Sequence, residues 1–453
     1  MSNSIFTDFD FVSAKAWKQK IQVDLKGGDY NELLLSKTNE GIVIKPFYHQ
    51  DNFKKLEIPE VKLETKICQT IFVDDEKKAN RIAKEVTKKG ATAIRFIAQQ
   101  TFDYKILFQD LDSKIKILLI CEFLEKEFLQ KLTKSTKNHK ISIVLDVINN
   151  FVKSGNWYRS KQEDFKEIKT LIKNNTSESY VGVNASVYQN SGANSVQQVA
   201  YTLAHLNEYL NENLITDKTE IQITFAVGSN YFFEIAKIRA FRYLFKKLTA
   251  KYQSKSTVNI LVEPTTRNKT IYDYNVNLLR TTTECMSAII GGANIVSNTA
   301  YDSIYHRSNA FGSRIARNQL LILLEESYFK NNKAIAKGSY YIEQLTYEIA
   351  EKALQLFKDI EKNGGFLQQL EKGTIQRKIE ESAKKEQEQF DKGEIVLLGT
   401  NKYPNKKDKM KADLELYPFV KVKARKTIIK PIIPKRLAEK LEQERLKAEN
   451  KVY

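Results

Sequence analysis

Residues 221–227 read IQITFAV and residues 258–263 read VNILVE, and short apolar runs of this kind decide the fold class. Five more occur along the chain, at residues 93–98 (AIRFIA), 115–121 (IKILLIC), 141–147 (ISIVLDV), 180–185 (YVGVNA) and 293–297 (ANIVS). Nearly continuous runs that are rich in β-branched residues are typical of parallel strands buried on both faces. We therefore predict seven such strands, and an eighth at residues 333–336, before the Gly338–Ser339 turn.

The segments between these runs have helical patterns. Ser195 and Gln198 form a capping-box pattern, followed by apolar residues at alternating spacings of three and four, namely Val196, Val199, Leu203, Leu206 and Leu210. Residues 343–362 repeat the pattern and end at Asn363-Gly364-Gly365, with Leu345, Ile349, Leu356 and Ile360 on one face. Alternating strands and helices without a Gly-rich dinucleotide fingerprint predict an α/β fold of the (β/α)8 TIM-type barrel class.

Proline and charge mark the ends of this barrel. Four of the seven prolines follow residue 400, and residues 401–453 hold 16 Lys or Arg against 7 Asp or Glu, about half of the net charge of +18. We predict an N-terminal arm at residues 1–60, a barrel at residues 61–403, and an extended basic C-terminal tail at residues 404–453. Because the excess is mostly Lys and sits in the tail, it is only a weak signal for nucleic acid.

Cysteine usage and the N-terminus predict a cytoplasmic protein. Cys68, Cys121 and Cys285 are odd in number and far apart in sequence, which favours reduced thiols. The N-terminus lacks the charged and apolar regions of a signal peptide, and no apolar run is long enough for a membrane span. We therefore expect no membrane association.

Few residues have the spacing of a catalytic or metal site. His49, His139, His205 and His306 never pair at helical spacing, and no phosphate-binding loop or nucleophile elbow is present. One polar cluster is denser than packing requires, at Arg280, Thr281, Glu284, Asp302, Arg314, Arg317 and Asn318. At a barrel rim these residues could bind an anion or hold loops through buried ion pairs.

Six runs carry a resemblance to a known family: residues 40–48 (EGIVIKPFY), 230–242 (NYFFEIAKIRAFR), 278–302 (LLRTTTECMSAIIGGANIVSNTAYD), 313–327 (SRIARNQLLILLEES), 338–346 (GSYYIEQLT) and 399–403 (GTNKY). In order and spacing they resemble the methylmalonyl-CoA mutases, coenzyme-B12-dependent acyl-CoA mutases, over roughly residues 17–403. The resemblance implies a (β/α)8 barrel. It also implies that the polar cluster above consists of family-motif residues with a structural role at the barrel rim.

The chain departs from the family at its functional positions. The family's Ser-Gly-Tyr-His-Met-Gln-Glu-Ala-Gly-Ala run, whose His donates to the substrate carbonyl, matches residues 184–193 and puts Val187 at the His position. Its His-Cys-Gln-Thr-Ser-Gly-Trp run matches residues 261–267, so that Leu261 and Glu263 replace two polar substrate contacts. The family's tyrosine over the corrin has no counterpart between Tyr48 and Tyr104. We expect no catalytic residue in this chain.

No cofactor is expected on this chain either. The family's cobalamin domain carries Asp-x-His-x-x-Gly, which this sequence lacks, and the residues after Tyr403 are too few for such a domain. We also expect bulky side chains of residues 93–98, 223–227 and 259–263 to fill the barrel interior, leaving a solid barrel without a tunnel.

These departures predict the small subunit of a heterodimeric methylmalonyl-CoA mutase, itself non-catalytic and structural. Adenosylcobalamin and the isomerisation of methylmalonyl-CoA to succinyl-CoA would belong to a large catalytic partner, contacted by residues 1–60. In the tail, Ile432, Ile433, Leu437 and Leu441 share one side, which fits either a partner contact or docking on the chain's own barrel. Two alternatives are a catalytic barrel whose cobalamin domain is a separate polypeptide, and a basic scaffold or nucleic-acid-binding module.

Overall fold

Eight parallel strands in sequential order form the centre of the computed structural model, which describes residues 10–61, 64–135, 141–173, 180–215, 219–331, 335–421 and 424–449. The strands are β3 (Lys66–Phe72), β4 (Ala93–Ala98), β5 (Lys116–Cys121), β6 (Ile141–Val144), β7 (Gly182–Asn184), β8 (Glu220–Val227), β9 (Thr257–Pro264) and β10 (Ile295–Val296). Their hydrogen-bonded order runs β6-β5-β4-β3-β10-β9-β8-β7, and a bridge between Leu145 and Val181 joins the two outer strands. The predicted TIM-type barrel is thereby confirmed.

The strands are not joined equally well around the barrel. β8 and β9 pair over eight residues each, from Glu220 opposite Thr257 to Val227 opposite Pro264. β10 pairs with β3 and with β9 at only two positions each, and the single Leu145–Val181 bridge links β6 to β7. The ring of strands is therefore weakest in two places, around β10 and between β6 and β7.

One of the eight strands lies outside the predicted set. The missing strand is β3, at the start of the barrel, whereas the described part of the predicted strand at residues 333–336 is not a strand. Residues 335 and 336 form a turn, and residues 333 and 334 lie outside the described residues. The sequence of β3, KICQTIF, is not a continuous apolar run, because Cys68 and Thr70 face the barrel interior while Ile67 and Ile71 join the outer core.

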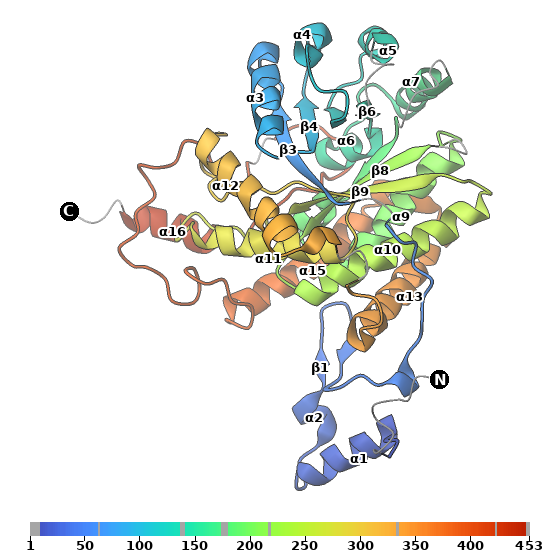
Figure 1. Cartoon of the computed structure of the whole chain (residues 1–453), viewed down its shortest axis with the longest axis vertical. Helices are drawn as coiled ribbons and strands as arrows, with labels where there is room; N and C mark the ends of the chain where they lie inside the picture. Colours follow the sequence, from blue (N-terminus) through green and yellow to red (C-terminus); the bar gives the residue numbers. More distant parts are fainter. Residues whose placement is uncertain are drawn as a thin grey trace.

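Helices cover the outside of the barrel (Figure 1). They are α3 (Glu76–Lys88), α4 (Tyr104–Phe108), α5 (Lys126–Ser135), α6 (Val147–Ser154), α7 (Lys161–Lys173), α8 (Ser186–Asn190), α9 (Ser195–Asn211), α10 (Tyr231–Lys251), α11 (Val276–Ile290), α12 (Ala310–Leu321), α13 (Tyr340–Lys362), α14 (Gly365–Glu371) and α15 (Thr374–Asp391). A π-helical turn (Ile322–Glu326) and a 3-10 turn (Phe329–Asn331) follow α12.

The two helices analysed from sequence are both present. The apolar stripe of α9 is buried as predicted, but its capping box consists of Asn194 and Gln197, one residue earlier than expected. Asn194 is the residue with extended backbone, whereas Ser195 is already helical. α13 ends at Lys362, before left-handed Gly364, and buries Leu345, Ile349 and Ile360, while Leu356 is half-buried.

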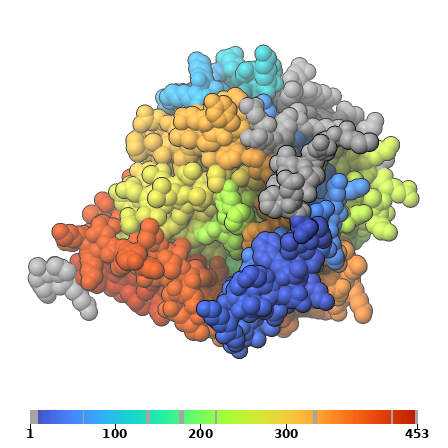
Figure 2. All heavy atoms as spheres, turned by 60° about the horizontal axis from the view of Figure 1, so that its bottom comes forward, coloured from blue at the N-terminus to red at the C-terminus, as the bar shows by residue number. Residues whose placement is uncertain are grey.

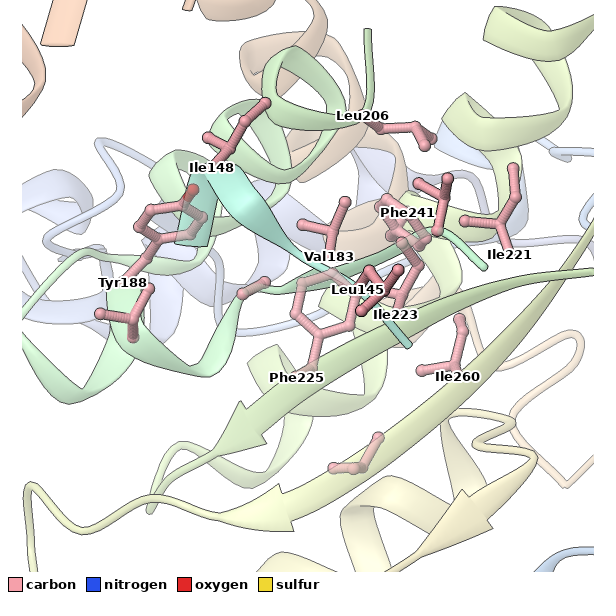
Figure 3. Packing of buried hydrophobic residues seen from close by; sticks show 14 of the residues in the cluster. Leu145, Ile148, Val183, Tyr188, Leu206, Ile221, Ile223, Phe225, Phe241 and Ile260 are labelled. Atoms are coloured by element: carbon pink, nitrogen blue, oxygen red, sulfur yellow. The ribbon is translucent and has the colours of Figure 1, made fainter. Parts of the chain in front are cut away.

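The aromatic side chains of β4 and β8 face the helices and not the barrel axis. Phe225 packs edge-on against Phe241 of α10, with ring centroids 5.0 Å apart. Figure 3 shows Ile221, Ile223 and Phe225 in one layer with side chains from α9 and α10. Because alternate residues of a strand point to opposite faces, their neighbours must face inward.

The N-terminal arm projects from the body of the barrel (Figures 1 and 2). It contains α1 (Ala14–Asp24), α2 (Tyr30–Leu34), the short antiparallel pair β1 (Ser36–Lys37) and β2 (Val43–Ile44), and a 3-10 turn (Gln50–Asn52). α1 has no buried residue, and the arm exposes Phe11, Val12, Trp17, Val23 and Leu33. Its hairpin meets the barrel through Glu40, which accepts a hydrogen bond from the backbone N–H of Ser195 at 3.4 Å.

The C-terminal tail runs across the carboxyl-terminal end of the barrel and ends in α16 (Glu439–Glu449). Backbone N–H groups of Ile428, Ile432, Lys435 and Leu437 donate to carbonyls in the helices and loops that follow β6, β7 and β9. Ile432 and Leu437 are buried, whereas Ile433 and Leu441 are 48% and 39% exposed. The tail is therefore docked on its own barrel, and the predicted apolar stripe is divided between the two sides.

None of the described helices is long and apolar enough to cross a lipid bilayer.

Candidate functional site at the barrel mouth

A polar cavity of about 510 Å³ opens at the carboxyl-terminal ends of β4 to β8. This end of a (β/α)8 barrel carries the active site in characterised enzymes of the fold, because the loops after the strands converge there. Its lining includes Arg95, Asp146, Asn184, Gln222 and Thr224 from the strand ends and Arg425 from the tail. A substrate of this chain would be expected to bind in this cavity, near the positions predicted from the family resemblance.

An ion pair crosses the barrel beneath this cavity. Arg95 Nη2 of β4 lies 2.6 Å from Glu263 Oε2 of β9, and both side chains are at least four-fifths buried. Arg95 Nε donates to Thr70 Oγ1 at 3.0 Å, and Thr70 lies 2.9 Å from Ser297 Oγ. Burial lowers the pKa of Arg95, but the Glu263 carboxylate more than offsets this and the pKa is raised overall. The guanidinium is thus charged, paired and fixed within the barrel.

The rest of the interior is closed by a buried cluster and a second ion pair. Cys68, Ala93, Leu118, Leu261 and Ile295 form the cluster. Lys116 Nζ of β5 lies 2.8 Å from Glu220 Oε2 of β8 at the amino-terminal ends of the strands. The expectation that bulky side chains fill the interior is wrong for the aromatic residues, because Phe96 and Phe225 point outward. Aliphatic side chains, Leu261 among them, occupy the interior together with the ion pairs.

Asp146 lines the mouth cavity but is fully engaged by its neighbours. Oδ1 lies 2.9 Å from His205 Nε2 and accepts from the Tyr209 hydroxyl at 2.8 Å, and Oδ2 accepts from the Asn184 N–H at 2.7 Å. Tyr188 Oη lies 2.9 Å from His205 Nδ1. Burial raises the pKa of Asp146, but His205 and these hydrogen bonds outweigh it and the pKa is lowered. The network ties α8 and α9 to β6.

Of the three positions that depart from the family, two are buried in apolar clusters and the third is held in an ion pair. Val187 is on α8, is 4% exposed and belongs to the outer hydrophobic core. Leu261 lies in the inner cluster, and Glu263 is held by Arg95. A valine side chain at this place provides no hydrogen-bond donor.

The predicted rim cluster is divided in the structure. On one side, the Glu284 carboxylate is 1% exposed and lies 2.8 Å from Lys269 Nζ, and Asn268 also donates to it. Arg280 donates to Asn277 and Thr270 and, through Nη2, to the carbonyl of Leu398. Thr281 accepts from Gln319. These contacts join α11 to the loops after β9 and after α15.

The remaining rim residues lie elsewhere. Asp302 accepts from Asn309 Nδ2 at 2.7 Å and lies 3.3 Å from His306 Nδ1. Arg317 donates to the carbonyl of Lys89 at 3.0 Å, whereas Arg314 lies over the Phe311 ring and Asn318 is exposed. The seven residues therefore do not form one anion site.

The described residues do not fit a cobalt ligand set. Both ring nitrogens of His205 are engaged and its side chain is fully buried, while His49 and His306 pair with Asp51 and Asp302. His139 lies outside the described residues. Within the described ranges no three His, Cys, Asp or Glu side chains come close enough to hold a metal ion.

Sequence reasoning overlooked the residues that organise the site. Arg95 stands inside the apolar run AIRFIA. A single cation in a buried strand needs a counter-ion, so this arginine is the signal that could have revealed the ion pair. A second example is Lys237, fully buried on α10, which donates to Gln198, Gln189 and the carbonyl of Ala226 and pairs with Glu234. Its partners are far apart in sequence, so only the fold brings them together.

Comparisons with known proteins agree on one family. The family described as methylmalonyl-CoA mutase matches residues 124–448. The methylmalonyl-CoA mutase small subunit of Porphyromonas gingivalis is 31% identical over 88% of this chain and 71% of its own length. Methylmalonyl-CoA mutases of Cereibacter sphaeroides and Escherichia coli are 32% and 33% identical over 57% and 47% of this chain. The match covers only 38% and 31% of those two longer chains.

Proposed function

The chain belongs to the methylmalonyl-CoA mutase family, and we propose that it is the small, non-catalytic subunit of a heterodimeric, adenosylcobalamin-dependent methylmalonyl-CoA mutase in the cytoplasm. The large partner subunit binds the cofactor and interconverts methylmalonyl-CoA and succinyl-CoA. The similarity to a relative named as a small subunit supports this assignment.

The Arg95–Glu263 ion pair is the observation that carries the proposal. Glu263 stands where the family has a polar substrate contact, and its carboxylate is 2.6 Å from a guanidinium instead of free to meet a ligand. The position of the family's donor histidine is Val187, buried in the core. A barrel with these substitutions lacks the donors that stabilise developing charge on a thioester carbonyl.

The N-terminal arm supplies the proposed contact with the large subunit. Phe11 and Val23 are 79% and 71% exposed, and Trp17 stacks on Phe47 at 4.3 Å while remaining 44% exposed. A projecting group of apolar side chains is typical of a surface that another protein covers. The arm (1–60), the barrel (61–403) and the basic tail (404–453) are thus three functional parts, with the rim residues holding the loops of the barrel.

Co-expression with a large mutase subunit tests the proposal. The two chains should copurify with one cobalamin for each pair, and the isolated small chain should bind no cobalamin. Mutase turnover by the isolated chain with adenosylcobalamin, alone or with a separate cobalamin domain, would instead favour a catalytic barrel. Salt-dependent retardation of nucleic acid by the isolated chain would favour the scaffold alternative.

A double variant tests the role of the barrel mouth directly. Arg95→Met with Glu263→Leu removes both charges, so neither is left buried without its partner. We expect the assembled complex to keep its kcat within about twofold. The matched control is Lys153→Met with Glu122→Leu, which removes a more exposed pair at the same mouth. A loss of kcat by the first variant only, in a complex that still assembles, would contradict a non-catalytic barrel.

A further inference from the structure

A separate cavity of about 320 Å³ lies at the amino-terminal end of the barrel strands, opposite the mouth cavity. The linker between arm and barrel covers it with Leu56, Ile58 and Val61, and Ile290 and Gly292 at the end of α11 form another wall. The lining is mainly apolar, and Arg242 of α10 is its most buried cation.

No carboxylate of the described residues pairs with the Arg242 guanidinium. It is 6% exposed, and Nε and Nη2 donate to the carbonyl of Gly292 at 3.1 and 2.6 Å, while Nη2 also donates to Asn294 Oδ1. The remaining guanidinium nitrogen, Nη1, forms no hydrogen bond with the described residues. Burial lowers the pKa of Arg242 to about 10, with no nearby acid to oppose the effect. A buried charge without a counter-ion is unusual, because its desolvation is not offset.

Four of the other charged residues that line this cavity are already paired, and the fifth, Lys55, is exposed. Glu343 Oε1 lies 2.5 Å from Arg239 Nη2 and accepts from the N–H of Gly338. Lys337 Nζ lies 2.8 Å from Glu60 on the exposed rim. The site therefore presents a fixed guanidinium next to an apolar wall, and it has no unpaired acid that would attract a cation.

We propose that this cavity binds a small aliphatic monocarboxylate. The carboxylate lies against Nη1 of Arg242, because a planar guanidinium matches a carboxylate in geometry and charge. The alkyl chain lies against Leu56, Ile58, Val61 and Ile290. The volume of the cavity is in the range of small-molecule sites. Inorganic phosphate matches the cation but leaves the apolar wall unused.

Calorimetric titration of the full-length chain tests the proposal, with hexanoate as the probe. Hexanamide has the same shape without the charge, and hexylamine has the opposite charge. We expect hexanoate to bind at least about tenfold more tightly than either, and more tightly than inorganic phosphate. Equal affinity for hexanoate and hexanamide, or no binding of hexanoate at millimolar concentration, would overturn the carboxylate site. Tighter binding of phosphate would replace it with a site for inorganic anions.

Two variants locate the ligand within the cavity. Val61→Phe fills the cavity, since the Val61 side chain faces the Gly292 backbone, and should weaken hexanoate binding at least about tenfold. Val23→Phe makes the same change on the exposed arm and should leave binding unchanged. Arg242→Met should abolish binding if circular dichroism shows a folded chain. If that variant does not fold, unchanged affinity of Val61→Phe alone overturns the assignment.

Discussion

The arm and the tail differ in how far they are built into the barrel: the arm reaches it through the hairpin, where Ile42 joins the main core, whereas the tail is docked along its length. α1 in the arm buries no residue, whereas α16 and the segment before it bury Arg436, Leu437, Glu439 and Glu442. Arg436 is ion-paired with Glu442 at 2.7 Å, and its guanidinium donates to the carbonyls of Lys269 and Pro418. The tail thus contributes to the folding stability of this chain, whereas α1 and α2 of the arm contribute mainly exposed surface.

The largest effect on stability is expected from removing the buried cation of the tail. Arg436→Met leaves the Glu442 carboxylate, 1% exposed, without its counter-ion, and we expect the free energy of unfolding to fall by about 3–5 kcal/mol. Arg425→Met is the matched control, because Arg425 is exposed and should change stability by less than about 1 kcal/mol. Urea denaturation measures both. Equal midpoints for the two variants would mean that the tail is not part of the folded unit.

Two glycines, one packed against the tail and one in the arm, should differ in how much a substitution by alanine destabilises the chain. Gly155 has a φ of 79°, and an added Cβ would lie 2.6 Å from the carbonyl oxygen of Ile429 in the tail. Gly27 in the arm has a φ of 97° but nothing within 4 Å. Both Gly→Ala changes strain the backbone by about 1–2 kcal/mol, and Gly155→Ala adds about 1–3 kcal/mol of overpacking. Thermal unfolding that ranks Gly27→Ala as equal or worse would reverse the comparison.

Deleting the arm should affect assembly and not the fold. Removing residues 1–34 takes away α1 and α2, which bury only Tyr30, so the unfolding free energy of the remainder should change by less than about 1 kcal/mol. On the proposed function, affinity for the large subunit should fall at least about tenfold. Tyr417→Ser removes an exposed aromatic residue of the tail and serves as the control. Unchanged affinity of the deletion would place the partner surface elsewhere.

The smallest expected effect is on local stability, which should change with pH in opposite directions in the hairpin of the arm and at the end of the tail. Burial raises the pKa of Glu40, so the docked hairpin loses stability as pH rises through that raised value, where the buried carboxyl ionises. Burial also acts on Glu449, but hydrogen bonds from the Tyr272 hydroxyl and the N–H groups of Met410 and Lys411 outweigh it and lower its pKa. The tail end is therefore stabilised above the ordinary Glu range and loses this as pH falls through the lowered pKa.

Hydrogen exchange at pH 4 and pH 7, corrected for intrinsic rates, measures this response. Protection of residues 405–413 should fall at pH 4, and protection of residues 36–44 should rise. Glu449→Gln and Glu40→Gln should each abolish the change in its own region only. A change of the same sign in both regions would contradict the two pKa directions.

Much of the barrel was predictable because its strands are short and buried on both faces. Seven of the predicted strands are present, whereas β3 escaped because its inward face carries Cys68 and Thr70 and breaks the apolar run. The same alternation explains why the aromatic residues predicted in the interior, Phe96 and Phe225, point outward instead. An apolar run such as AIRFIA contributes only half of its side chains to each face, and the inward half includes Arg95.

The site was less predictable, because its contacts join distant segments. Glu263 was identified as a departure from the family, but its partner Arg95 is 168 residues away in sequence. The rim cluster looked compact only because its residues follow one another along the chain, and the fold separates Arg317 from Glu284. Prolines predicted an extended tail correctly, but they carry no information about the buried Arg436–Glu442 pair that docks it.

The two weak places in the ring of strands have a consequence for how the chain opens. Between β6 and β7 one bridge at Leu145 and Val181 completes the ring, and β10 is held by only two pairs on each side. The strands from β3 to β6, and the pair β8 and β9, are joined along longer stretches. Native-state fluctuations should therefore part the ring at Leu145 first, and the strands from β3 to β6 should exchange their amide hydrogens as one cooperative unit and β8 with β9 as another.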